Sequence, residues 1–249
     1  MNRSLADTHP RDLKGMMIDL PTLPVVYQEL FRKMQDPQVA VPEIAEIITQ
    51  DQALATKILH MVNSAFYGYK QEIRTIARAV VILGFQAVRS AALATSVFEY
   101  FKGEESGGID MAKFWEHSVA VAAACKVMAA ASGNKQPEEA FVVGLLHDVG
   151  KLIEKRHFPD DFDHIVAVAG RQRLSWYACE RQLFQVDHAT IAKVLFRSWN
   201  FPPSVVEAVY MHHVPEMSRQ HPQLTALVHL ADDFSYRIGY GAPGAEAPS

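Results

Sequence analysis

The chain has 249 residues, of which 49% are hydrophobic and 21% charged, as is usual for a packed globular protein. Its formal net charge is −4, and lysines and arginines are spread along the chain, so we expect no direct binding of nucleic acid. No apolar run is long enough to span a membrane, and residues 1–15 lack the apolar core of a signal peptide. We therefore expect a cytoplasmic protein with no membrane partner.

The first half of the sequence has the periodicity of short helices separated by turn residues, with almost no strand pattern. We expect a flexible N-terminal arm over residues 1–17, followed by a helical part over residues 18–102. Helices are predicted after Pro24, after Pro42, over 52–65 with Asp51 as N-cap, over 76–83 with Thr75 as N-cap and Gly84 as the break, and over 86–101. The glycine-rich stretch 103–108 is the clearest hinge in the chain and is taken as the boundary between two helical parts.

The second half, residues 109–240, is predicted to be another helical part, with a disordered tail over 241–249. Its helices are expected over 111–131, from Pro137 to Arg156 without a break, over 161–172, 175–183 and 188–199 with Asp187 as N-cap, over 203–213, and over 223–239. Cys125 and Cys179 lack the C-x-x-C spacing, so we expect two free thiols in a reducing compartment.

An adjacent pair, His147-Asp148, stands in an otherwise apolar helical stretch. Burying a carboxylate without a partner costs several kcal/mol, so such a group must be paired or must bind a metal. Adjacent residues of a helix point about 100° apart, so both side chains can reach one ion while the carboxylate bridges to a second. The pair therefore predicts a metal site.

Other histidines and one further aspartate also lie in apolar helical stretches: His117, His188, His212, His213 and Asp232. A single buried histidine is more often a core residue than a ligand, but this ordered combination is hard to obtain by chance. Imidazole and carboxylate ligands suit Fe, Mn, Ni or Zn, so we expect one or two divalent transition metals. Lys151, one turn after the pair, is either a surface lysine or a phosphate contact.

Several longer segments carry a family resemblance. They are NSAFYG and I-x-T-I-x-x-A-V-x-x-LG in the first half, and FWEHS, GLLHDVGKL, VDHATIAKVLFRSWNFPPSVVEAVYMHH and LADDF in the second. Over about residues 18–238 the sequence resembles the HDOD domain, the HD-related output domain of bacterial signal transduction proteins. The resemblance implies an all-α fold, in which an HD-domain, phosphodiesterase-like helical bundle carries an additional N-terminal helical subdomain.

The resemblance also implies roles for individual residues. By similarity to dinuclear HD proteins, one metal would be held by His117, His147, Asp148 and Asp232, and a second by Asp148, His188, His212 and His213, with Asp148 bridging. Lys151 matches the lysine of the HD-x-GK motif. Lys151 and Asp148 are the candidate catalytic residues. The sequence departs from the family at Gln52, where DPALA reads DQALA. It also departs from the HD-GYP phosphodiesterases, because no Gly-Tyr-Pro segment follows His212-His213. Hydrolysis of cyclic di-GMP is therefore less expected.

Two functions stay open. The favoured one is a signal transduction or regulatory protein that acts by binding a signalling protein partner or a small phosphorylated or nucleotide ligand. The alternative is a metal-dependent phosphohydrolase or phosphodiesterase in which Lys151 binds a phosphate oxygen. An oxygenase-like diiron chemistry, which some HD relatives perform, has no positive support here. The 249 residues contain no receiver or GGDEF domain, so we expect the input or partner to come from another protein.

Overall fold

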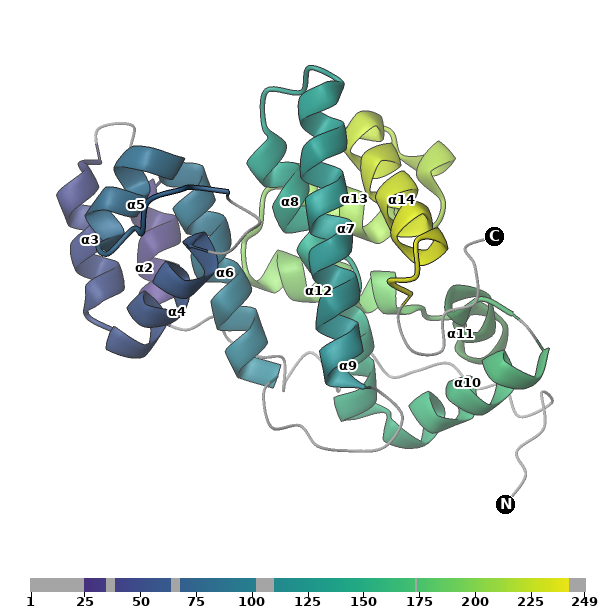
Figure 1. Ribbon diagram of the computed structural model, residues 1–249. Helices are drawn as coiled ribbons and strands as arrows, with labels where there is room; N and C mark the ends of the chain where they lie inside the picture. Colours follow the sequence, from purple (N-terminus) through teal and green to yellow (C-terminus); the bar gives the residue numbers. More distant parts are fainter. Residues whose placement is uncertain (1–24, 35–38, 64–67, 102–109, 173, 242–249) are drawn as a thin grey trace. The chain divides into compact units, whose positions relative to one another are not determined.

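The computed structural model describes residues 25–34, 39–63, 68–101, 110–172 and 174–241 (Figure 1). All the regular elements in these ranges are helices, and no strand occurs among them, so the predicted all-α class is confirmed. The chain forms two compact units, one over Thr22–Glu104 and one made mainly of Glu105–Ser249. The predicted arm at 1–17, the hinge at 103–108 and all of the predicted tail except Gly241 lie outside the described residues.

The described part of the first unit has five helices: α2 (Val25–Met34), α3 (Val41–Thr49), α4 (Gln52–Val62), α5 (Ile76–Leu83) and α6 (Phe85–Phe101). Both predicted N-caps are confirmed, because the Asp51 side chain accepts a hydrogen bond from the Leu54 N–H and Thr75 accepts one from Arg78. Gly84 ends α5 with a φ of 86°, a conformation that glycine adopts without strain. The isoleucines of α3, α4 and α5 form the core of this unit.

Within the described ranges, the second unit has eight α-helices: α7 (Met111–Ala131), α8 (Pro137–Leu146), α9 (Val149–His157), α10 (Pro159–Gln172), α11 (Trp176–Phe184), α12 (His188–Ser198), α13 (Pro203–Met211) and α14 (Pro222–Arg237). A short 3₁₀ turn lies at Pro215–Met217. The long helix α7 packs against α8 and α14, as Figure 1 shows, while α12 packs against α9 and α13. Asp187 caps α12 as predicted, by accepting a hydrogen bond from the Thr190 N–H.

The prediction of one unbroken helix from Pro137 to Arg156 is wrong. The chain turns at His147 and Asp148, where Asp148 has φ −97° and ψ 3°, and α9 starts only at Val149. The turn brings Gly150 so close to the start of α12 that a Cβ atom there would lie 1.9 Å from the His188 carbonyl oxygen. The His-Asp pair therefore lies at a corner between two helices, and the 100° spacing expected for neighbouring helical residues does not apply to it.

Two further sequence expectations can be compared with the structure. Cys125 and Cys179 are both free, as predicted, and both are buried. Among the described residues, no helix combines the length and the apolar character needed to cross a membrane.

The close approach at Gly150 leads to a stability prediction. Gly150→Ala forces the added methyl group into the backbone of His188, so we expect the free energy of unfolding to fall by about 3 kcal/mol or more. The control is Gly133→Ala, where the space is open but φ is 75°, so only the backbone cost of about 1 kcal/mol is expected. Urea unfolding of both variants measures the difference, and equal losses would contradict the steric account.

Candidate metal centre

The second unit brings all seven predicted ligands together, although they come from five places in the chain. His117 lies in α7, His147 and Asp148 form the α8–α9 turn, His188 starts α12, His212 and His213 follow α13, and Asp232 lies in α14. Three groups each have ligand atoms within 4.8 Å of one another: Asp148 with His188, His212 and His213; His117 with His147 and Asp148; and His147 with His212 and Asp232. Asp148 belongs to two of these groups, which is compatible with the predicted bridging position.

The distances between donor atoms suit a shared cation. Asp148 Oδ1 lies 3.2 Å from His188 Nε2, and Asp148 Oδ2 lies 3.5 Å from His147 Nε2 and 3.8 Å from His117 Nε2. His117 Nε2 is also 3.3 Å from Asp232 Oδ1. With metal–ligand bonds of about 2.0–2.2 Å, neighbouring ligand atoms lie about 2.8–3.6 Å apart, so the cluster has nearly the size of a metal's coordination sphere.

The histidine rings are oriented by hydrogen bonds on the side away from the cluster. His117 Nδ1 donates to the Tyr240 carbonyl at 2.6 Å, and His147 Nδ1 donates to the Gly144 carbonyl at 2.7 Å. His212 Nδ1 donates to the Val209 carbonyl at 2.6 Å. Because a carbonyl oxygen can only accept, each Nδ1 carries a proton. This tautomer leaves Nε2 as the atom that can bind a metal.

The Glu180 side chain performs the same task for His188. Glu180 Oε2 accepts a hydrogen bond from His188 Nδ1 at 2.7 Å, and Glu180 Oε1 accepts from the His188 backbone N–H at 3.1 Å. The carboxylate is completely buried and also accepts from the Trp176 indole N–H at 2.9 Å. A buried carboxylate behind a metal-binding histidine fixes the ring and makes the opposite nitrogen more basic.

The pKa values show how the charges interact. Burial lowers the pKa of His212 to about 3, and the neighbouring His147 and His188 act in the same direction. Burial also lowers the pKa of His147. Burial disfavours the charged form of His188 too, but the charge of Glu180 and the hydrogen bonds to Asp148 and Glu180 raise its pKa to about 10. Burial would raise the pKa of Asp148, but Lys151 and the histidines hold it well below its usual range.

The protonation states and hydrogen bonds of these residues fit a bound metal ion. His147 and His212 are neutral near pH 7, with Nδ1 protonated, so each presents an Nε2 lone pair to the interior. The buried His212 Nε2 has no hydrogen-bond partner among the described residues. An unsatisfied buried acceptor costs about 1–3 kcal/mol, which a cation at this point would remove. The cluster is therefore compatible with a metal site, and its predicted division into two sets of ligands stays a prediction.

Lys151 lies inside this cluster, so the interpretation of a surface lysine is excluded. Its Nζ atom is 2.6 Å from Asp148 Oδ2, and the side chain is 10% exposed. Burial alone would lower the pKa of Lys151, but the charge of Asp148 and the hydrogen bond to it raise that pKa. The lysine therefore stays charged and neutralises Asp148, while its predicted contact with phosphate stays a prediction.

The sequence analysis missed three groups that shape the centre: the Glu180 carboxylate, the Tyr240 carbonyl and the Tyr177 ring. Tyr177 stacks on His213, with ring centroids 4.6 Å apart and an interplanar angle of 26°. Glu180 had a detectable signal, because it lies between Trp176, Cys179 and Leu183 on the buried face of α11. The Tyr240 contact had none, since a backbone carbonyl carries no side-chain signature.

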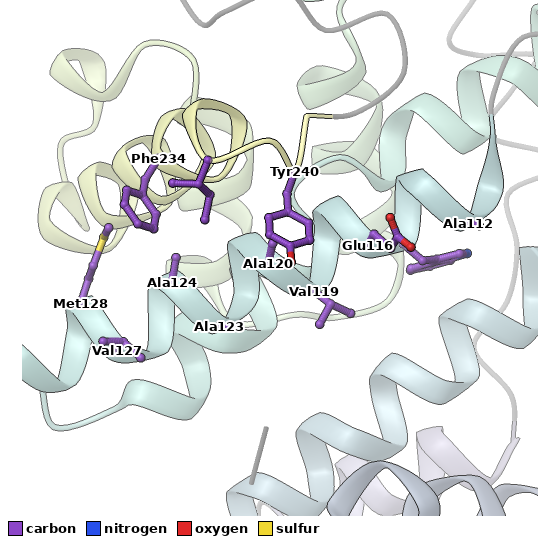
Figure 2. Close-up of a pocket in the computed structure, with 12 residues that line it drawn as sticks. Ala112, Glu116, Val119, Ala120, Ala123, Ala124, Val127, Met128, Phe234 and Tyr240 are labelled. Carbon is purple, nitrogen blue, oxygen red and sulfur yellow. The ribbon is translucent and has the colours of Figure 1, made fainter. Parts of the chain in front are cut away.

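An open apolar groove of about 790 Å³ lies along the outer face of α7 and α14. Figure 2 shows its alanine floor and the Phe234 and Tyr240 rings at its edge. The lining residues are Ala112, Trp115, Glu116, Val119, Ala120, Ala123, Ala124, Val127, Met128, Phe234, Ile238 and Tyr240. Through the Tyr240 carbonyl, which accepts from His117, this surface is connected to the metal centre.

A helical unit in which histidines and aspartates from separate helices converge is the arrangement expected of an HD-type metal-binding domain. The family model of the HDOD domain matches residues 20–215, and the chain belongs to the HDOD domain family. The matched range includes all the predicted ligands except Asp232 in α14.

Solved structures support the same family. An HDOD domain protein of unknown function from Geobacter sulfurreducens is 26% identical, with a TM-score of 0.83 over 96% of this chain and 83% of that chain. A protein from Shewanella amazonensis SB2B, described as a candidate phosphohydrolase, is 28% identical, with a TM-score of 0.80 over 92% of this chain and 82% of that chain.

A relative in Treponema pallidum (strain Nichols), an uncharacterized protein, is 23% identical over 216 residues, which are 86% of this chain and 42% of that protein. The chain thus spans less than half the length of the curated relatives it matches.

The shared position of Asp148 predicts how metal binding responds to substitution. Asp148→Asn removes the charge from the two groups of ligands that share Asp148, so we expect the metal content to fall to nearly zero. His117→Gln and His188→Gln each remove a ligand from only one group, so each is expected to leave about one equivalent if the protein binds two. Elemental analysis after gel filtration gives the stoichiometry, and an Asp148→Asn protein with full metal content would contradict the bridging role.

The carboxylate behind His188 predicts a second effect. Glu180→Gln keeps the shape of the side chain but loses the charge that makes His188 basic, so metal affinity should fall about 10–100-fold. The matched control is Glu154→Gln, a buried carboxylate that also accepts from the Trp176 indole. Competition titration with a metal chelator measures both affinities, and an equal loss in the two variants would show that the effect is only structural.

Proposed function

We propose that this chain is a signal transduction or regulatory protein, in which a retained HD metal centre supports the binding of a ligand or partner. The observation that carries this proposal is the burial of the centre. His147, His188 and His212 are 0% exposed, and the Asp232 side chain is only 16% exposed. A substrate phosphate would need an open position on the metal and a path to it.

Two side chains of the second unit lie against the cluster. Tyr177 lies flat against His213, and Lys151 is held by Asp148. Lys151 would have to leave Asp148 before it could contact a phosphate. A centre closed in this way suits a structural or sensing metal better than one that turns over substrate.

The hydrogen bond between His117 and Tyr240 supports a regulatory role. It joins a predicted metal ligand directly to the segment that follows α14, and the Tyr240 side chain is about half exposed in the apolar groove. A movement of the His117 ring would therefore act on Tyr240, at the surface, through one hydrogen bond of 2.6 Å. A protein that reports metal or ligand state to a partner needs such a connection.

A metal-dependent phosphohydrolase is the second candidate, because the complete donor set and Lys151 occur together. The metals, when bound, would supply Lewis-acid polarisation and neutralise the charge that develops on a phosphoryl group. Lys151 would bind a phosphate oxygen after leaving Asp148, and its raised pKa keeps it cationic for this task. The Shewanella amazonensis protein described as a candidate phosphohydrolase is a relative in support of this alternative.

The two functions give different results in one experiment. Protein loaded with Mn, Fe or Ni is tested on a panel of nucleotides and phosphoesters, with His147→Ala as the control that removes a ligand. The regulatory proposal expects no turnover above this control. It also expects metal loading to slow hydrogen exchange around His117 and residues 232–241. Hydrolysis that is abolished by His147→Ala would overturn the regulatory proposal in favour of the enzyme.

A further inference from the structure

A second cavity, of about 360 Å³, lies between α12, α13 and the segment that follows the 3₁₀ turn. It is lined by Lys193 and Arg197 from α12, by Val206, Glu207 and Tyr210 from α13, and by Arg219, among others. None of the seven predicted metal ligands lines it. Cavities of about 300–1,000 Å³ are typical of small-molecule sites, so the volume suits a small ligand.

The charge around this cavity is strongly positive. Lys193, Arg197 and Arg219 all line it, and Glu207 is the single carboxylate in the lining. Among the described residues, none of the three cations forms an ion pair with a carboxylate. Burial and the neighbouring Arg197 both lower the pKa of Lys193, as expected where like charges are held together. Such a group of cations is stabilised by an anion.

Glu207 offsets one of the three positive charges, but its Oε1 atom is hydrogen-bonded to the backbone and forms no ion pair with them. Its Oε1 atom accepts hydrogen bonds from the backbone N–H groups of Arg219 and Gln220, at 2.7 and 3.0 Å, and from the Ser218 hydroxyl at 3.1 Å. These bonds hold the 218–220 segment, and with it Arg219, beside α13. The Glu207 Oε2 atom has no hydrogen-bond partner within the part of the chain that the structure describes.

The remaining walls are apolar or aromatic. They are formed by Phe201, Pro203, Val206, Tyr210 and Met211. The Lys193 ammonium lies 3.5 Å from the centre of the Tyr210 ring, a cation–π contact that keeps the lysine at the wall of the cavity. An inorganic anion would leave these walls without a partner, whereas a ligand with a planar ring and an anionic end would contact both kinds of surface.

We propose that this cavity binds a nucleoside monophosphate, with its phosphate at Lys193, Arg197 and Arg219 and its base against the apolar part of the wall. The base supplies the planar body that the apolar walls can contact, and the phosphate supplies the anion for the cations. The proposal stands independently of catalysis at the metal centre. The proposed ligand would contact α12, which begins with His188, and α13, which is followed by His212-His213.

The test is isothermal titration of the full chain, kept in chelator so that the metal centre cannot hold phosphate. The probes are AMP, GMP, CMP and UMP, together with the unphosphorylated nucleosides and inorganic phosphate. We expect at least one monophosphate to bind with a stoichiometry of about one, and more tightly than both its nucleoside and inorganic phosphate. Failure of all four monophosphates to bind at millimolar concentration would overturn the proposal.

The site is located by a charge-matched pair of variants. Arg197→Gln with Arg219→Gln removes two cations from the cavity, and both side chains belong to exposed residues, so folding should be kept. Lys113→Gln with Lys135→Gln removes two exposed cations elsewhere and serves as the control. We expect a loss of at least tenfold in affinity for the first variant and less than twofold for the control. Equal effects, or no effect of the first variant, would overturn the assignment of the site.

Discussion

The buried carboxylate of Asp148 is the constraint on which the second unit depends. Taking a carboxylate out of water is costly unless cations or hydrogen-bond donors surround it. Here Lys151 Nζ lies 2.6 Å from it and His188 Nε2 3.2 Å, while His147 and His117 complete the surroundings. These groups belong to α7, to the α8–α9 turn, to α9 and to α12, so satisfying one charge requires three helices and a turn to pack in one arrangement. The packing of these helices and the candidate metal site are therefore linked through this one buried charge.

The features that were correctly predicted from the sequence depend on interactions between residues close together in the chain. The caps at Asp51, Thr75 and Asp187 follow from side chains that reach the N–H groups of the next turn, and each is confirmed. The break at His147-Asp148 was missed because apolar residues continue on both sides of it, so the periodicity alone shows one helix. Its cause is tertiary, since Gly150 meets the backbone of His188, 38 positions away in the chain. No local pattern contains that contact.

The residues of the candidate site could be predicted from the sequence, but the contacts that orient them could not. Histidines and aspartates in apolar stretches are conspicuous, and the structure places the whole predicted set in one cluster. What sequence reasoning did not reach is how the rings are held. Three rings are oriented by backbone carbonyls, which any residue type supplies, and only Glu180 behind His188 has a side chain that a search for buried carboxylates could find. The sequence thus predicts which residues are ligands. The tautomers of the histidine rings can be assigned only from the contacts that the fold provides.

Burial of the centre and the position of the cationic cavity together favour regulation over turnover. The rings of His188 and His212 are 5.5 Å apart between centroids, and each is attached to a helix that also lines the cavity. A ligand in the cavity and a metal at the centre would therefore act on the same pair of helices, α12 and α13. If the spacing of these helices differs between the metal-bound and metal-free states, each ligand must change the affinity of the other by the same factor. A closed centre is suited to such linkage, because tight packing turns a small shift of one helix into a change in the donor geometry. Turnover at this buried centre would instead require the packing to loosen each time a phosphate entered.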